Sequence, residues 1–114
     1  MGRLTTHVLD TAHGQPAADL RIDLFRGRDT VAAATVRTNA DGRCDKPLLE
    51  GDALTPGTYR LEFHVGDYFH VLGFAGAGQF LDVVPVVFVV SDADANYHVP
   101  LLCSPWAYST YRGS

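Results

Sequence analysis

Short stretches in which apolar and polar residues alternate occur along most of this sequence. Residues 58–65 are the clearest case, because every second side chain is apolar, namely Tyr59, Leu61, Phe63 and Val65. Successive side chains of a β-strand point to opposite faces, so this period predicts a strand with one buried face. Further strands are predicted at residues 4–10, 20–25, 31–38, 84–90, 97–103 and 107–111, with a short edge strand at residues 44–49.

Between these runs lie polar segments with the composition of turns. Residues 39–43, NADGR, contain an Asp-Gly pair, which favours a tight hairpin turn and places Arg43 at its exit. Residues 84–90 and 97–103 flank the polar segment SDADAN and are predicted to pair as a second hairpin. Loops are expected at residues 11–19, 26–30 and 50–57.

One segment departs from the period of a strand. Residues 67–74 carry apolar side chains at helical spacing and predict one or two helical turns, with Asp67 as N-cap and Gly73 as the stop. About seven or eight short strands and one short helix predict an all-β fold, an antiparallel β-sandwich. With 114 residues, 46% of them hydrophobic, the chain is large enough to bury one core, so residues 1–114 are predicted to form a single domain.

The charge distribution argues against nucleic acids and membranes as partners. The formal net charge is -4, the only lysine is Lys46 and the arginines are scattered, whereas nucleic-acid binding requires clustered positive charge. The longest apolar run, residues 83–90, is far shorter than the roughly 20 residues of a membrane-spanning helix. The start of the chain has no apolar stretch typical of a secretory signal, so a cytoplasmic location is expected.

Several types of catalytic or metal site have no counterpart in the sequence. The glycine-rich residues 73–78, GFAGAG, lack the Lys-Ser/Thr ending of a phosphate-binding loop, and no GxSxG motif of a serine nucleophile occurs. Cys44 and Cys103 are far apart without CxxC spacing, and we expect two free thiols in a reducing compartment. No HxH or HExxH spacing supplies metal ligands, so no metal site is predicted.

Histidines are the most informative polar residues, with five in the chain. We interpret His13, His64 and His70 as surface or hydrogen-bonded framework residues, His64 because it lies on the polar face of its strand. His7 and His98 each interrupt a strand that is otherwise apolar or hydroxylic. The pattern leaves open whether they form a site or are buried and hydrogen-bonded.

The end of the chain, residues 97–114, has the sequence YHVPLLCSPWAYSTYRGS. Chain termini normally fray and carry no chemistry. This one ends in two tyrosines, an arginine and a serine, behind a predicted strand that contains His98. We therefore expect the terminus to fold back onto the domain and to form part of a site.

Three motifs resemble a known family. LTTHVLDTAHGQPA near the start, TNADGR in the middle and the closing stretch that ends in YRGS are similar to those of the transthyretin-like 5-hydroxyisourate hydrolases. The resemblance covers essentially the whole chain. It implies a transthyretin-like antiparallel β-sandwich of about eight strands with one short helix. It also implies a homotetramer whose sites lie in the channel between dimers.

The resemblance implies roles for the residues that match the motifs of the family. The catalytic residues would be His7, Arg43 and His98, and the substrate-binding residues would be His7, Arg43, Tyr111 and Ser114. The implied reaction hydrolyses the small molecule 5-hydroxyisourate to 2-oxo-4-hydroxy-4-carboxy-5-ureidoimidazoline in urate degradation, without a cofactor. One histidine would be the general base, while the guanidinium of Arg43 would contact the carbonyl or oxyanion.

Two other functions are compatible with the sequence. A non-catalytic carrier of the same fold would use the histidines and the terminus only to line a binding channel for a small ligand. A structural or partner-docking protein is a weaker alternative. Faster decay of 5-hydroxyisourate than the spontaneous rate would distinguish the enzyme from both.

Overall fold

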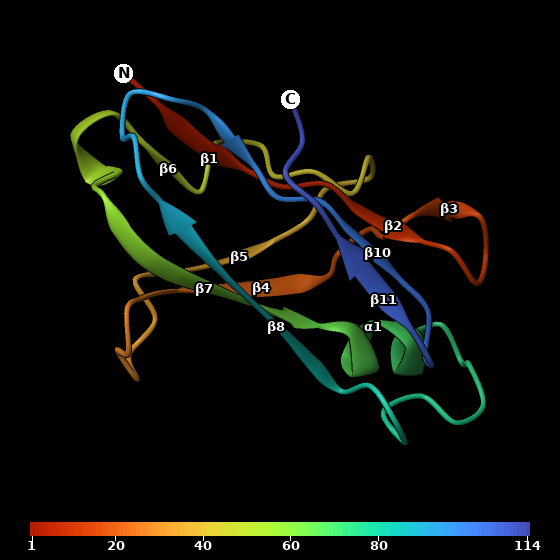
Figure 1. Ribbon diagram of the computed structural model, residues 1–114. Coiled ribbons are helices and arrows are strands. Elements are labelled where there is room, and N and C mark those ends of the chain that lie inside the picture. The colour runs from red at the N-terminus through yellow and green to blue at the C-terminus, as the bar shows by residue number, and fades with distance from the viewer.

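The computed structural model describes residues 1–114 and contains two layers of strands (Figure 1). The first layer is an antiparallel sheet with the strand order β5-β4-β7-β8. Its strands are β4 (Arg21–Arg26), β5 (Ala34–Arg37), β7 (Gly57–His64) and β8 (Val83–Val90). In β7, Tyr59, Leu61 and Phe63 are buried, which confirms the predicted inward face of this strand.

The second layer joins two smaller sheets, with the strand orders β6-β1-β9 and β11-β10-β2-β3. The strands are β1 (Arg3–Thr5), β2 (Val8–Asp10), β3 (Gln15–Pro16), β6 (Leu49–Glu50), β9 (Tyr97–His98), β10 (Leu101–Cys103) and β11 (Tyr108–Thr110). The pairs β1/β9 and β2/β10 are parallel. Leu4, Val8 and Leu101 of this layer are fully buried and pack in one core with Leu61 and Phe63 of β7, so the predicted all-β sandwich is confirmed.

The predicted strand at residues 4–10 is interrupted in the middle. β1 pairs with β6 and β9, whereas the N–H of Val8 donates to the carbonyl of Gly42 at 2.8 Å. Between the two strands, His7 forms an isolated antiparallel bridge with Arg43. The break arises because the backbone changes partners there, and it brings His7 to the turn at residues 39–43.

The predicted hairpin between residues 84–90 and 97–103 is wrong. β8 pairs with β7, whereas β9 and β10 pair with β1 and β2 in the other layer. Both runs carry buried apolar side chains, such as Val84 and Leu101. When the two runs lie in opposite layers, their apolar side chains pack against each other across the core. More apolar surface is removed from water in this arrangement than if the two runs were neighbouring strands of one sheet.

The α-helix, α1 (Val65–Val71), begins earlier than predicted. Its N-cap position is occupied by His64, and Asp67 lies in the first helical turn. Val65 and Phe69 are fully buried, so contact with the core explains the early start better than side-chain capping does. The structure contains no helix that is long and apolar enough to cross a membrane.

Two predicted strands are shorter than expected. Only Ala34–Arg37 of residues 31–38 is a strand, and Val31 is 80% exposed. Within residues 44–49 only the last residue enters a strand, in β6, because Pro47 has no N–H to donate to a neighbouring strand. The expected loop after β6 begins with a short 3-10 helix, Gly51–Ala53.

Candidate functional site

A polar pocket lies where the two ends of the chain meet the turn at residues 39–43. We call it the polar pocket and define it by the residues that line it, which are Arg3, Thr5, Arg43, Asn96, His98 and Ser114. No hydrophobic residue lines it. Figure 1 shows that the C-terminal residues continue from the end of β11 toward the junction of β1 and β2. The expectation that the terminus folds back onto the domain is confirmed.

Strand register assembles this pocket from distant parts of the sequence. In the parallel pair β1/β9, Thr5 lies opposite His98. His98 also forms an isolated antiparallel bridge with Gly113, which brings the last residue, Ser114, to the same place. The backbone bridge between His7 and Arg43 brings Arg43 to the polar pocket.

The turn that presents Arg43 is stabilised by the side chain of Asn39. Its Oδ1 accepts hydrogen bonds from the backbone N–H groups of Asp41, at 2.9 Å, and Arg43, at 3.2 Å. Gly42 has a φ of 75°, and a Cβ atom there would collide with the carbonyl oxygen of Val8. Glycine is therefore required both by the backbone conformation and by the close approach of β2.

His98 is half-buried, and one of its ring nitrogens is occupied. Its Nδ1 lies 2.8 Å from the hydroxyl oxygen of Thr5. Burial, followed by electrostatic interaction with Arg43 and with His7, lowers the pKa of His98 below the usual value for histidine. The imidazole is therefore mainly neutral at pH 7 and can accept a proton.

His7 is next to the polar pocket, with its tautomer defined by one hydrogen bond. Its Nε2 lies 2.9 Å from the backbone carbonyl oxygen of Asp41. A carbonyl oxygen only accepts, so Nε2 carries the proton and Nδ1 holds a lone pair in the neutral ring. The same bond anchors the His7 ring to the turn that carries Arg43.

The terminus approaches His98 very closely. The N–H of Gly113 donates to the carbonyl oxygen of His98 at 2.8 Å. A Cβ atom on Gly113 would lie 2.5 Å from Cδ2 of the imidazole, closer than any normal contact. Only glycine allows the chain to pass here without moving the ring.

The structure brings together four of the five predicted site residues, His7, Arg43, His98 and Ser114. Tyr111 is 60% exposed and does not line the polar pocket. It lies in a separate apolar groove between β8 and the C-terminal segment, whose lining includes Val86, Val87, Phe88, Val89, Tyr97 and Tyr111.

Three pocket residues were missed from the sequence, although a signal for them existed. Arg3 and Thr5 are four and two positions before His7, and Asn96 is two positions before His98. Alternate residues of a strand share a face, so each histidine marks the face on which these side chains lie. Applying the strand period outward from the histidines would have identified them.

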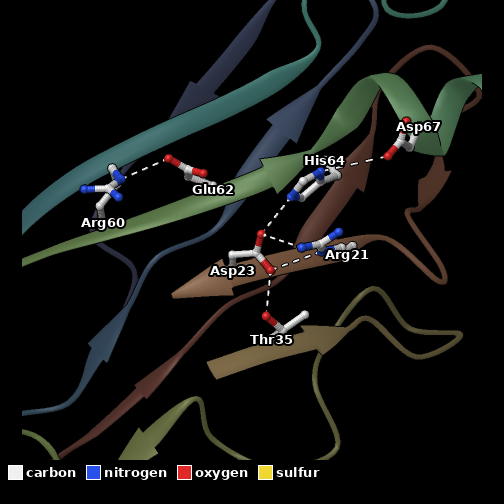
Figure 2. Close-up of polar contacts among 7 residues, drawn as sticks. All are labelled: Arg21, Asp23, Thr35, Arg60, Glu62, His64 and Asp67. Atoms are coloured by element: carbon white, nitrogen blue, oxygen red, sulfur yellow. Dashed lines mark hydrogen bonds and ion pairs between the residues drawn. The ribbon is translucent and has the colours of Figure 1, made fainter. Parts of the chain in front are cut away.

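His64 is a framework residue, but its side chain is not on an open surface as its place in the alternation suggested. Its side chain is 15% exposed, and Nε2 lies 2.9 Å from Oδ2 of Asp23 (Figure 2). Asp23 also accepts hydrogen bonds from Thr35, at 2.8 Å, and from Arg21, at 3.1 Å. Burial would raise the pKa of Asp23, but the hydrogen bonds from His64, Thr35 and Arg21 outweigh it, and the pKa lies below its usual value.

The other two framework histidines also match the prediction. Nδ1 of His13 lies 2.7 Å from the buried carboxylate of Asp10, which also accepts a hydrogen bond from Tyr68 in α1 at 2.8 Å. His70 is exposed near the end of α1. Cys44 and Cys103 are both unpaired.

The polar pocket combines the groups that hydrolysis of an amide requires. A neutral imidazole can take a proton from water, and a guanidinium that stays charged can stabilise an oxyanion. No group of three or more metal-ligating side chains lies together in the structure.

Comparisons with known proteins agree with this fold. Residues 4–113 match the HIUase/Transthyretin family. The chain is 60% identical to a 5-hydroxyisourate hydrolase of Ralstonia nicotianae, over the full length of both proteins. It superimposes on a Klebsiella pneumoniae 5-hydroxyisourate hydrolase with a TM-score of 0.85 and 32% identity, again over all of both chains. A crystal structure of (S)-allantoin synthase gives a TM-score of 0.93 and 45% identity over 99% of this chain, which spans 44% of that longer one.

Proposed function

The chain belongs to the HIUase/Transthyretin family, and on this premise we propose that it is an enzyme that hydrolyses 5-hydroxyisourate. The product would be 2-oxo-4-hydroxy-4-carboxy-5-ureidoimidazoline, and the reaction a step in urate degradation. One observation carries the proposal. A neutral, half-buried His98 lies with Arg43 and the chain terminus in a polar pocket, within a sequence 60% identical to a protein named for this activity.

The reaction opens a six-membered ring at an amide bond. Water adds to the carbonyl carbon, the carbon–nitrogen bond breaks, and the leaving nitrogen takes a proton while the carbonyl becomes a carboxylate. We assign the general base to His98, because its lowered pKa keeps it unprotonated at neutral pH. The guanidinium of Arg43 stabilises the oxyanion through its planar N–H donors.

His7 and Ser114 complete the proposed site. The Nε2–H of His7 donates to the carbonyl of Asp41, which leaves the lone pair of Nδ1 to orient the substrate by accepting a hydrogen bond from one of its N–H groups. The proton that His98 takes from water then passes to the leaving nitrogen. Ser114 lines the polar pocket and offers its hydroxyl to the ring of the substrate. The scheme uses no cofactor.

We propose a homotetramer, with Tyr111 acting at a site formed between subunits. β8 is the edge strand of its sheet, and Val87 and Val89 on it are 64% and 63% exposed. Exposed apolar side chains beside an unpaired edge favour association with another copy. Sedimentation at micromolar concentration tests the assembly, and a fully active monomer would contradict a site shared between subunits. The proposed location is the cytoplasm, in keeping with two unpaired cysteines.

The direct test is the decay of 5-hydroxyisourate that urate oxidase generates in the cuvette. We expect the protein to accelerate this decay over the spontaneous rate, and His7→Ala and His98→Ala to remove most of the acceleration. The double variant should lose much less than the sum of the two single losses, because residues that act as one unit are not additive. His70→Ala is the matched control, since His70 is exposed and outside the pocket.

A carrier of a small ligand is the second candidate, because the apolar groove beside Tyr111 is lined mainly by hydrophobic residues. A carrier would bind an aromatic ligand and leave the decay of 5-hydroxyisourate at its spontaneous rate. Saturable binding together with an unchanged decay rate would replace the enzyme proposal with this one.

A further inference from the structure

The residue just before Gly113, Arg112, makes two side-chain contacts with the segment that leads to His98. Cζ of Arg112 lies 4.2 Å from the centroid of the Tyr97 ring, and its Nη2 donates to the backbone carbonyl of Asn96 at 3.2 Å. Asn96 and Tyr97 immediately precede His98 in the chain. Arg112 therefore contacts the same short segment that carries the imidazole of the pocket.

We propose that Arg112 is a positioning residue, which holds Gly113 and Ser114 against His98 by stacking on Tyr97. This inference rests on the proposed function for its kinetic consequence. Arg112 itself does not line the polar pocket; it lines the apolar groove together with Tyr97. Its effect on the reaction is therefore transmitted through the last two residues.

Tyr97 provides a rigid platform for this contact. Its side chain is buried, with 4% of the residue exposed. Its phenol oxygen accepts hydrogen bonds from the backbone N–H groups of Ser91 and Asp92, each at 3.1 Å. A ring fixed at its far end in this way presents one face to the guanidinium, the geometry that a cation–π contact requires.

The last two residues need such support because little else restrains them. Gly113 makes one backbone hydrogen bond, to His98, and Ser114 is exposed. Terminal residues fray unless they are tied down, and glycine loses more conformational freedom on ordering than any other residue. A second anchor immediately before them limits the freedom of the chain where it meets the imidazole.

The kinetic test is a double-mutant cycle between Arg112→Ala and Tyr97→Leu. We expect each single variant to lower kcat/KM at least ~10-fold, and the double variant to equal the worse single variant within about threefold, because both remove the same contact. Tyr97→Phe keeps the ring that faces Arg112 but loses the hydrogen bonds of the phenol oxygen, so it should lose less activity than Tyr97→Leu. Arg28→Ala is the matched control, since Arg28 is exposed and remote from the pocket. Losses that multiply in the double variant would overturn the proposal.

A second measurement does not depend on activity or on the folding of the Tyr97 variant. The heteronuclear NOE of the Gly113 amide, and the rate at which carboxypeptidase releases Ser114, both report order in the terminus. Arg112→Ala should lower the NOE and raise the release rate at an unchanged Tm. A terminus that stays ordered in Arg112→Ala would overturn the inference. Absence of hydrolysis by the wild-type protein would instead refute the proposed function and leave this ordering test valid.

Discussion

Gly113→Ala adds a single methyl group next to the imidazole of His98. The φ of Gly113 is not in the left-handed region, so alanine is compatible with the backbone. The new Cβ would lie 2.5 Å from Cδ2 and 3.2 Å from Cγ of His98, whereas ordinary contact begins at 3.4 Å. Either the ring or the terminal segment must therefore move by roughly 0.9 Å.

A displacement of this size determines the expected loss of activity. Misplacement of a catalytic group by ~1 Å can cost about 100-fold in rate. That factor corresponds to about 2.7 kcal/mol of lost transition-state stabilisation. The fold should be nearly unaffected, within about 0.5 kcal/mol, because Gly113 follows the last strand and is next to the end of the chain.

The assay is kcat/KM for 5-hydroxyisourate beside thermal unfolding of the same samples. Ser109→Ala is the control, since it changes a small, exposed side chain in β11 and leaves the polar pocket intact. Wild-type kinetics in Gly113→Ala would refute the reasoning, because the methyl group would then fit without moving His98. A large drop in Tm would show instead that the terminus supports the fold.

Four further predictions concern charged groups. Arg43→Lys keeps the positive charge but loses the planar set of donors, and should lower kcat/KM at least ~10-fold in the same assay. Unchanged kinetics would show that the arginine only stabilises the turn. The general base works only when unprotonated, and burial, Arg43 and His7 lower the pKa of His98. The midpoint of the acidic limb in the pH profile of kcat/KM should therefore lie below the usual range of histidine and shift to higher pH in Arg43→Gln. An unchanged midpoint in Arg43→Gln would assign the general base to another residue. The lowered pKa of Asp23 contributes stability that is fully present above the usual aspartate pKa of ~3.9 and is lost as pH falls through the pKa of the folded state. In chemical denaturation at a series of pH values, Asp23→Asn should therefore lose less stability at acidic pH than the wild type. The same dependence of stability on pH in both proteins would contradict this. His64→Ala leaves this carboxylate with one partner fewer and should cost about 1–3 kcal/mol of stability, measured in the same experiment.

The sequence by itself determined the sandwich and most of the candidate residues. Strand character and inward faces follow from side-chain period, a local property, which is why Tyr59, Leu61 and Phe63 were correctly assigned to the core. The motifs around His7, Arg43 and His98 were equally local, since each lies within a short run of adjacent residues.

The tertiary structure decided which strands pair and which side chains meet. Residues 84–90 and 97–103 have the composition of a hairpin, but burial of both apolar faces sends them to opposite layers. His64 has the position of a surface residue in its strand, and only the neighbouring strand β4 supplies the Asp23 carboxylate that binds it. The contacts of Arg112 with Tyr97 and of Gly113 with His98 likewise require the chain to fold back on itself. Strand pairing and side-chain packing join residues far apart in the sequence, so no local pattern encodes these contacts. The free energy of the whole core selects among the arrangements that local patterns allow.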